Sequence, residues 1–394
     1  MVWTLALRFS SPLHVLFCVL VCLVSLTQAR SAQSPVTLRV GAVLSLTGEH
    51  ASVGRAQEAA LRAWEASVQT RGFSVEVLIA DDGSDPERAA ARSEAFLAEG
   101  VHALLCCAAE SALARTRPSI KRAGVPTLTL TPEALKVGGV ADDYWFFSVP
   151  PGRAAQLSSL LLYERSQGSS TLALLGLEGE IGDAALHAIT NSGMRLVAEA
   201  RYPPDVRVLT PEALWIAAQQ PDAVLVWGHR EDTHIALSAL SERGFEGRVY
   251  VRPQIYETAG TLERADLRGA ATLTDAISVG STLARTHPTY EETRRFTSAL
   301  SATYGANRPT VEGAYAWDAL SLLQRAFEQM LTYTPDVQTD LSRTRQALRD
   351  SLVGLEPVTG AAAVYDYLET DHSGVQPGSL VVAAIARGRL VAEP

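Results

Sequence analysis

The chain has 394 residues and a formal net charge of −9, because 43 acidic residues outnumber 34 basic ones. An acidic balance excludes nucleic acid as the main partner, since binding to phosphates needs a basic face. The length exceeds what one hydrophobic core usually organises, so two lobes are expected.

The N-terminal residues have the layout of a secretory signal peptide. Arg8 precedes an apolar run from Val15 to Val24, and Thr27 and Ala29 follow it as small residues for a cleavage site. The run is shorter than the roughly 18 residues that span a bilayer as a helix. We therefore assign residues 1–29 to a cleaved signal and expect the mature chain in the periplasm, with an uncleaved membrane anchor as the alternative.

Two of the four cysteines, Cys18 and Cys22, leave with the signal, so the mature chain keeps only the adjacent pair Cys106 and Cys107. This pair either forms a vicinal disulfide or provides small buried thiols at a strand end, and we favour the second interpretation. No His or Cys cluster has the spacing of metal ligands, so neither a metal nor a cofactor is expected.

Short apolar runs alternate with helical patterns along the first half of the mature chain, as is typical of parallel strands joined by helices. The pattern predicts strands over Val36–Leu46, Phe73–Ile79, Val101–Cys106 and Thr127–Thr131, and helices over Val53–Val68, Pro86–Glu99 and Ser111–Arg122.

The same rhythm restarts after a crossover predicted at Phe146–Pro151, so a second sheet follows the first. Strands are predicted over Thr171–Leu177, Leu196–Ala200 and Ala223–Trp227, and helices over Gly182–Ser192, Pro211–Gln219, Tyr290–Tyr304 and Val311–Leu331. The end of the chain is expected to form strands over Ala361–Tyr367 and Ser379–Val391 around a turn at Asp371–Gly374. In doubly wound sheets of this kind, ligands bind beyond the carboxyl ends of the strands.

Five motifs occur in the order and spacing of one known family: VGAVLSLTG at Val40–Gly48, ADDGSDP at Ala80–Pro86, AGVP at Ala123–Pro126, FFSV at Phe146–Val149 and AYAWDAL at Ala314–Leu320. On these residues the mature chain resembles the type I periplasmic binding proteins, in particular the leucine/isoleucine/valine-binding branch. The resemblance implies two doubly wound parallel-sheet α/β lobes joined by a three-strand hinge. It also implies discontinuous lobes, an N-terminal one over 36–150 plus 281–352 and a C-terminal one over 151–280 plus 353–394.

The resemblance further implies a function. The chain is expected to act as a monomer that binds a small-molecule solute in the interlobe cleft, closes on it at the hinge, and delivers it to an ABC transporter permease in the inner membrane. A ligand-sensing module with the same fold is the alternative. An enzyme is not expected, because the sequence contains no nucleophile elbow, phosphate-binding loop or dinucleotide-binding motif.

Carried over residue by residue, the family's ligand contacts fall on seven positions. The first lobe contributes Val53, Ser111, Thr129 and Thr131, and the second lobe contributes Ile181, His229 and Gln254. Hydroxyl groups at a helix N-terminus suit an anionic group of the ligand, although Ser111 could equally be a helix cap.

The second half of this set departs from the family. An aromatic residue of the family falls on Ile181, a tyrosine on His229, and the acid that pairs with a ligand ammonium on Gln254. Because glutamine supplies no charge, we expect a small polar or carboxylate-bearing solute instead of a branched-chain amino acid. Arg230 and Arg252 would suit a carboxylate, or are solvated surface charges.

Five other residues near the strand ends have two interpretations each. Asp81 and Asp82 are read as loop residues and not as catalytic acids, since no partner base is evident. His50 could touch a ligand or simply be exposed, and Trp227, like Tyr256, could form an apolar wall or pack in the core.

Overall fold

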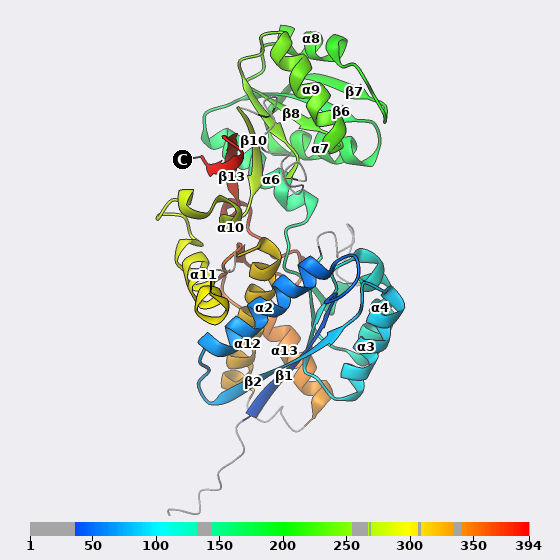
Figure 1. The fold of residues 1–394 in the computed structure, drawn as a ribbon, viewed down its shortest axis with the longest axis vertical. Helices are drawn as coiled ribbons and strands as arrows, with labels where there is room; N and C mark the ends of the chain where they lie inside the picture. The colour runs from blue at the N-terminus through cyan, green and yellow to red at the C-terminus, as the bar shows by residue number, and fades with distance from the viewer. Residues whose placement is uncertain are drawn as a thin grey trace, which may run out of the picture. The chain divides into compact units, whose positions relative to one another are not determined.

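The computed structural model describes residues 36–131, 143–253, 267, 269–305, 309–334 and 340–393. These residues form two α/β lobes, each built on its own largely parallel sheet (Figure 1). The fold class expected from the sequence is therefore confirmed. The exact lobe boundaries, at 36–150 plus 281–352 and 151–280 plus 353–394, stay a prediction.

The first sheet has five strands in the order β2-β1-β3-β4-β5. Its three pairings of β1 with β3, β3 with β4 and β4 with β5 are all parallel. Phe146–Ser148 is the edge strand of this sheet, so the sequence prediction that treated Phe146–Pro151 only as a crossover was wrong at its start. The strands are β1 (Val36–Leu44), β2 (Phe73–Asp81), β3 (Ala103–Cys106), β4 (Thr127–Thr129) and β5 (Phe146–Ser148).

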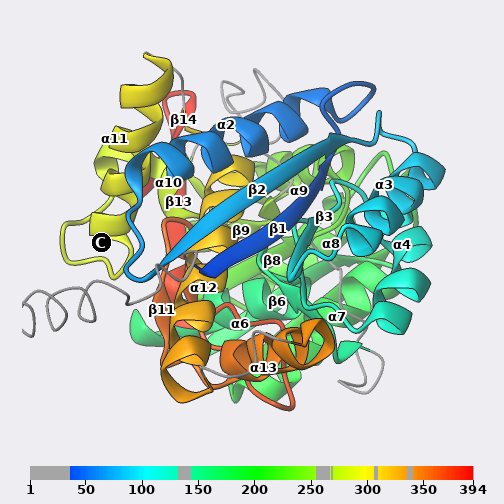
Figure 2. The same ribbon diagram turned by 90° about the horizontal axis from the view of Figure 1, so that it is seen from below.

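Helices cover both faces of the first sheet. Figures 1 and 2 show α3 and α4 on one side of the strands, and α2 with α12 on the other. Trp64 of α2 donates from Nε1 to the Ser321 hydroxyl of α12 at 3.0 Å, which ties these two helices together. The helices are α2 (Ala51–Ser67), α3 (Pro86–Ala98), α4 (Glu110–Ala123), α11 (Tyr290–Tyr304), α12 (Val311–Tyr333) and α13 (Leu341–Val353).

The second sheet has seven strands in the order β14-β13-β10-β9-β8-β6-β7. The strands from β10 to β7 pair in parallel, whereas β13 and β14 add an antiparallel edge. These strands are β6 (Thr171–Leu177), β7 (Arg195–Tyr202), β8 (Ala223–Trp227), β9 (Arg248–Val251), β10 (Ala270–Thr274), β13 (Val381–Ala386) and β14 (Arg389–Ala392).

Two hydrophobic clusters, one on each face, hold helices against the second sheet. β6 shows why both faces must be covered, since all seven of its residues are buried and nearly all are apolar. Leu175 and Leu177 pack with α8 and α9, while Leu172 and Leu174 pack with α6 and α7. These helices are α6 (Arg153–Ser166), α7 (Glu180–Ser192), α8 (Thr210–Ala218) and α9 (Arg230–Glu242), and a short α10 (Ala276–Val279) follows β10.

The C-terminal part differs from the sequence prediction. The single strand expected over Ser379–Val391 is two antiparallel strands, β13 and β14, because Arg387 and Gly388 both adopt positive φ and turn the chain. Of the strand expected over Ala361–Tyr367, only β12 (Val364–Tyr365) is a strand, and it pairs with β11 (Val358–Thr359). The N–H groups of Ala361 and Ala362 bond instead to the buried carboxylate of Asp318, at 2.6 and 2.9 Å.

Candidate functional site

The carboxyl edge of the first sheet collects four of the seven predicted ligand contacts. Since β1, β3 and β4 run parallel, the residues that follow them lie along one edge. Val53 lies in the first turn of α2, Ser111 in the first turn of α4, and Thr129 and Thr131 at the end of β4. The structure thus brings these four residues to one edge of the sheet, and their contact with a ligand stays a prediction.

The loop between β1 and α2 is fixed by Asp81 at the end of β2. Its carboxylate accepts hydrogen bonds from the N–H groups of Leu46 (2.9 Å), Thr47 (3.1 Å) and Gly83 (2.8 Å), and from the Thr47 hydroxyl (2.7 Å). The Thr47 hydroxyl and these N–H groups hold the pKa of Asp81 below its usual value. Asp81 is therefore a loop-holding residue, which agrees with its interpretation from sequence.

The start of α4 is open in the sense that its N-cap side chain does not cap it. Its N-cap position is Ala109, whose side chain caps nothing, and the first helical bond runs from the Leu113 N–H to the Ala109 carbonyl at 3.2 Å. The N–H groups of Ser111 and Ala112 therefore point out of the helix end. Ser111 is exposed and lies inside the helix, so the alternative that it serves as the cap was wrong.

The two threonines of β4 have different surroundings. Thr129 is fully buried and donates its hydroxyl to the Phe147 carbonyl at 3.3 Å. Thr131 is 5% exposed and lies just beyond the strand end. Because Thr129 already satisfies its hydroxyl inside the sheet, the exposed Ser111 is better placed than Thr129 at this edge.

Cys106 and Cys107 close β3 and form a vicinal disulfide. Both are completely buried and their sulfur atoms lie near the hydroxyl of Thr116 on α4. The interpretation of two free thiols was wrong, although their burial at a strand end was predicted. Cys107 has φ +124°, a conformation that side-chain-bearing residues rarely adopt, just before the loop that leads to Ser111.

The carboxyl edge of the second sheet holds Ile181 and His229. Ile181 is half-buried at the start of α7 and packs against both hydrophobic clusters of this sheet. His229 is exposed before α9, and its N–H donates to the Asp232 carboxylate at 3.3 Å. Gln254 and Tyr256 lie outside the described residues.

Trp227, Arg230 and Arg252 at this edge each contact neighbouring residues of the second sheet or its loops. Trp227 is 2% exposed and belongs to the cluster beneath α6 and α7, so the core interpretation was right. Arg230 pairs with its neighbour Glu231 at 2.9 Å. Arg252 donates from Nη1 to the Gly228 carbonyl at 3.0 Å, which places its guanidinium beside the loop after β8.

Tyr202 is a polar residue of this edge that sequence reasoning missed. Its side chain is fully buried, and its hydroxyl has no hydrogen-bond partner among the residues that the structure describes. The hydroxyl lies so close to Gly228 that a Cβ at that glycine would overlap it. Burial, followed by the nearby Asp232 carboxylate, raises the pKa of Tyr202 well above its usual value.

Within the described ranges, no group of three or more His, Cys, Asp or Glu side chains is arranged to hold a metal ion. A search of the same residues for membrane spans finds no helix with the length and apolar character that crossing a bilayer requires.

The sequence profile of the family described as periplasmic binding protein matches residues 37–388. This match covers nearly the whole chain. The chain belongs to the type I periplasmic binding proteins.

Solved structures of other bacterial proteins share this fold at low identity. One from Rhodospirillum rubrum, described as a branched-chain amino acid ABC transporter, is 22% identical with a TM-score of 0.74, over 91% of this chain and 100% of that one. An extracellular ligand-binding receptor from Rhodopseudomonas palustris HaA2 is 22% identical, with a TM-score of 0.64 over 92% and 100%. The branched-chain amino acid transporter substrate-binding protein LivJ from Streptococcus pneumoniae, in complex with isoleucine, is 15% identical, with a TM-score of 0.57 over 90% and 98%.

No curated protein matches the chain in sequence. The likeness to the solved structures therefore establishes the fold of this periplasmic binding protein, while its ligand must be argued from its own side chains.

Proposed function

We propose that this periplasmic binding protein is the solute-binding component of an ABC importer. It binds a small polar or carboxylate-bearing solute, such as an amino-acid-like molecule, an amide or an organic acid, closes its two lobes on it, and delivers it to the permease in the inner membrane. Membership of the family supports a binding role, and the descriptions of the Rhodospirillum and Streptococcus proteins support a role in transport. The proposal includes no catalytic activity.

The observation that carries the ligand class is the open start of α4. Ser111 presents an exposed hydroxyl beside N–H groups that no cap occupies. Such a helix end favours a carboxylate or another polar oxygen, because the N–H groups and the helix dipole carry partial positive charge. At the positions to which the resemblance carries the family's second-lobe contacts, Ile181 and Gln254 stand in place of groups that would bind a branched-chain amino acid.

A thermal-shift screen tests the proposal. The mature chain is mixed with amino acids, amides, ureas, and aliphatic and aromatic carboxylates, and ligand at 100 times its Kd is expected to stabilise the fold by about 2.7 kcal/mol. Ser111→Ala should lower the affinity for the ligand that stabilises the protein most by about tenfold, since one hydrogen bond to a charged group is lost. Ser301→Ala, at an exposed position in the last turn of α11, is the matched control.

The outcomes separate the parts of the proposal. Failure of every compound in the panel to stabilise the protein would argue against a small polar solute. Binding that Ser111→Ala and Ser301→Ala leave equally strong would remove the α4 hydroxyl from the site.

Export to the periplasm is part of the same proposal. The signal layout of residues 1–29 supports it. N-terminal sequencing of the protein from a periplasmic fraction should begin at Arg30; a full-length N-terminus in the membrane fraction would point to an uncleaved anchor.

A further inference from the structure

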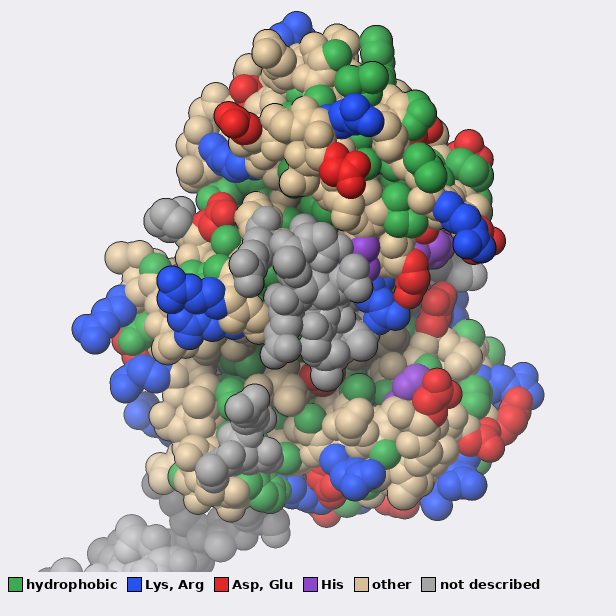
Figure 3. All heavy atoms as spheres, turned by 45° about the horizontal axis from the view of Figure 1, so that its top comes forward, with side chains coloured by type: hydrophobic (Ala, Val, Ile, Leu, Met, Phe, Trp, Pro, Cys, Tyr) green, Lys and Arg blue, Asp and Glu red, His purple; other side chains and the backbone are tan. Residues whose placement is uncertain are grey.

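Large hydrophobic side chains are exposed in one short stretch of the second lobe. Val208 is 63% exposed, Leu214 55% and Trp215 53%, all within eight consecutive residues at the start of α8. Single exposed hydrophobics are ordinary on a protein surface, whereas a contiguous group of them marks an interaction surface. Figure 3 shows hydrophobic side chains at the surface of the part of this lobe that carries α8.

The exposed residues of α8 lie on one face of the helix. Pro211, Leu214, Trp215 and Ala218 follow the spacing i, i+3, i+4 and i+7, and all four are exposed. We call them, together with Val208, the α8 surface. The opposite side of the helix packs in the core through Ala213 and Ile216.

The helix is therefore apolar on both sides. Its one charged residue, Glu212, is half-buried. A helix that is hydrophobic all round is normally covered on all sides, so the α8 surface is expected to have a partner.

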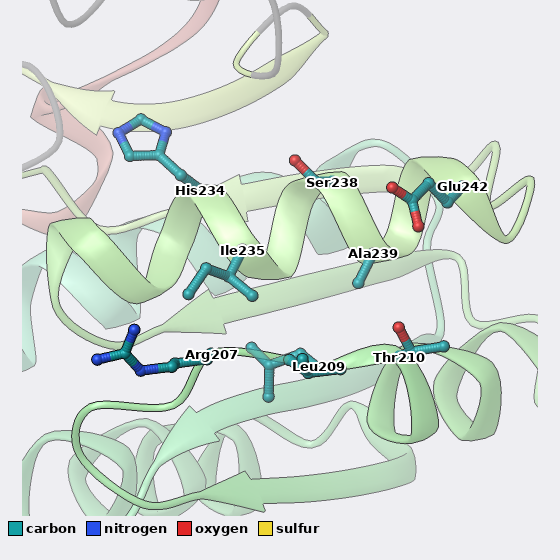
Figure 4. A pocket seen from close by; sticks show the side chains of 9 residues that line it. Arg207, Leu209, Thr210, His234, Ile235, Ser238, Ala239 and Glu242 are labelled. Atoms are coloured by element: carbon teal, nitrogen blue, oxygen red, sulfur yellow. The ribbon is translucent and has the colours of Figure 1, made fainter.

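A groove runs beside the α8 surface, between the β7–α8 loop and α9. Its volume is about 350 Å³ and its lining includes Arg207, Thr210, Ser238 and Glu242. Figure 4 shows Arg207 and Glu242 at opposite ends of this groove. Neither forms an ion pair with another residue in the part of the chain that the structure describes.

We propose that the α8 surface binds the α8 surface of a second copy of this chain, across a twofold axis. In such an isologous contact each surface meets itself in the opposite direction. The apolar stripes then cover one another, and Arg207 of each copy lies opposite Glu242 of the other. The groove carries one charge of each sign at its two ends, which is the arrangement that makes a surface complementary to itself.

The proposal replaces the monomer expected from the sequence and is independent of the proposed ligand. One helix face with its neighbouring loop is a small interface, at or below the roughly 1,200 Å² of stable complexes. The dimer is therefore weak, with a Kd on the order of 10 µM.

Sedimentation equilibrium of the mature chain from about 1 to 200 µM tests the proposal, since this range brackets the expected Kd. The chain should shift from monomer to dimer across the range. The double variant Leu214→Glu with Trp215→Glu should stay monomeric, with association weakened at least about tenfold, because four carboxylates would meet in an apolar contact. Leu368→Glu, 50% exposed outside the α8 surface, is the matched control and should dimerise like the parent protein.

Charge reversal tests the antiparallel pairing. Arg207→Glu and Glu242→Arg should each weaken the dimer several-fold, and the double variant should restore it, because each pair is then reversed as a whole. A parent chain that stays monomeric at about 200 µM would overturn the proposal. So would a dimer that Leu214→Glu with Trp215→Glu leaves intact, or one that the double charge reversal does not restore. Circular dichroism of each variant confirms that it is folded.

Discussion

The α-carbon of Gly54, in the first turn of α2, lies directly against the carbonyl group of Ser45, which follows the last residue of β1. The second sheet repeats this relationship, since Gly182 in the first turn of α7 lies against the carbonyl of Leu177 at the end of β6. In both lobes a glycine lets a helix begin immediately against the strand that precedes it. This close approach sets the position of the first-turn N–H groups at the carboxyl edge of each sheet.

Gly54→Ala should therefore destabilise the protein. A Cβ at this position would overlap the Ser45 backbone, which cannot rotate away as a side chain can. We expect the free energy of unfolding to fall by about 2 kcal/mol or more, measured by urea denaturation.

Gly378→Ala is the control for this substitution. A Cβ at Gly378 would meet nothing within 4 Å. The free energy of unfolding of this variant should therefore stay within about 0.5 kcal/mol of that of the parent protein. Equal stability of the two variants would show that α2 can move away from β1 at no cost.

We expect His102 to make the stability of the first lobe depend on pH. His102 lies in the chain between α3 and β3. Its Nδ1 accepts a hydrogen bond from the backbone N–H of Arg39 at 2.9 Å. Burial, with the charges of Arg345 and Arg39, lowers the pKa of His102 to about 4. The folded protein therefore favours the neutral form of the His102 imidazole.

Stability should fall on acidification between pH 6.5 and 4, because the unfolded chain takes up a proton on His102 in this window and the folded chain does not. The contribution of neutral His102 to the free energy of unfolding is fully present above pH 6.5. It amounts to about 2 kcal/mol after allowance for solvent screening. His102→Asn keeps an acceptor for the Arg39 N–H and should flatten the pH profile of urea unfolding by this amount. His187→Asn, on an exposed part of α7, should leave the profile unchanged; an equal effect of both would contradict the assignment.

The sequence predicted those buried strands that are uninterrupted apolar runs bounded by polar residues. It did not predict β9 and β10 of the second sheet, although all five residues of β10 are buried. The ends of β6 and β8 agree with the predicted Thr171–Leu177 and Ala223–Trp227. α11 also begins and ends where its pattern predicted, at Tyr290 and Tyr304. The helices α6, α9 and α13 were not predicted. The hydrophobic pattern of α6 is weak, since Leu160, Leu161 and Leu162 follow one another.

Features that depend on distant residues could not be predicted from local patterns. The N–H groups of Ala361 and Ala362 leave the expected strand because Asp318, more than 40 residues earlier, accepts both of them. At the site, Tyr202, Gly228 and Arg252 come together only because three strands end at one edge. No spacing in the chain signals that contact.

Tyr202→Phe should leave stability unchanged or raise it by about 1 kcal/mol. The substitution removes a buried hydroxyl that lacks a partner among the described residues, and an unsatisfied buried polar group costs free energy. Tyr250→Phe is the contrasting variant, because its hydroxyl donates to the buried carboxylate of Glu164. We expect Tyr250→Phe to lose about 2 kcal/mol.

Thermal and urea unfolding of these two variants gives the comparison, and the ligand screen adds a second readout. If Tyr202→Phe lowers ligand affinity while its stability is unchanged, the hydroxyl contacts the solute. A loss of stability as large as that of Tyr250→Phe would contradict the unpartnered state of Tyr202.

The disulfide between Cys106 and Cys107 predicts the thiol content of the mature chain. These are the only cysteines after residue 29. Alkylation of the unfolded, unreduced protein should label neither of them, and alkylation after reduction should label both, as read by mass spectrometry. Two labelled cysteines before reduction would restore the interpretation of free buried thiols.

Gln254→Glu should shift the ligand preference towards molecules that carry an ammonium group. The resemblance to the leucine/isoleucine/valine-binding branch assigns this position to the acid that pairs with the ligand ammonium, and a carboxylate there would restore the charge that glutamine lacks. The ratio of the leucine Kd to the Kd of its analogue without the amino group, 4-methylpentanoate, should fall at least about tenfold, or about 1.4 kcal/mol. Calorimetric titration measures both constants, with Gln167→Glu after α6 as the control. An unchanged ratio would remove Gln254 from the site, and the ligand class would then rest on Ser111 and the open start of α4.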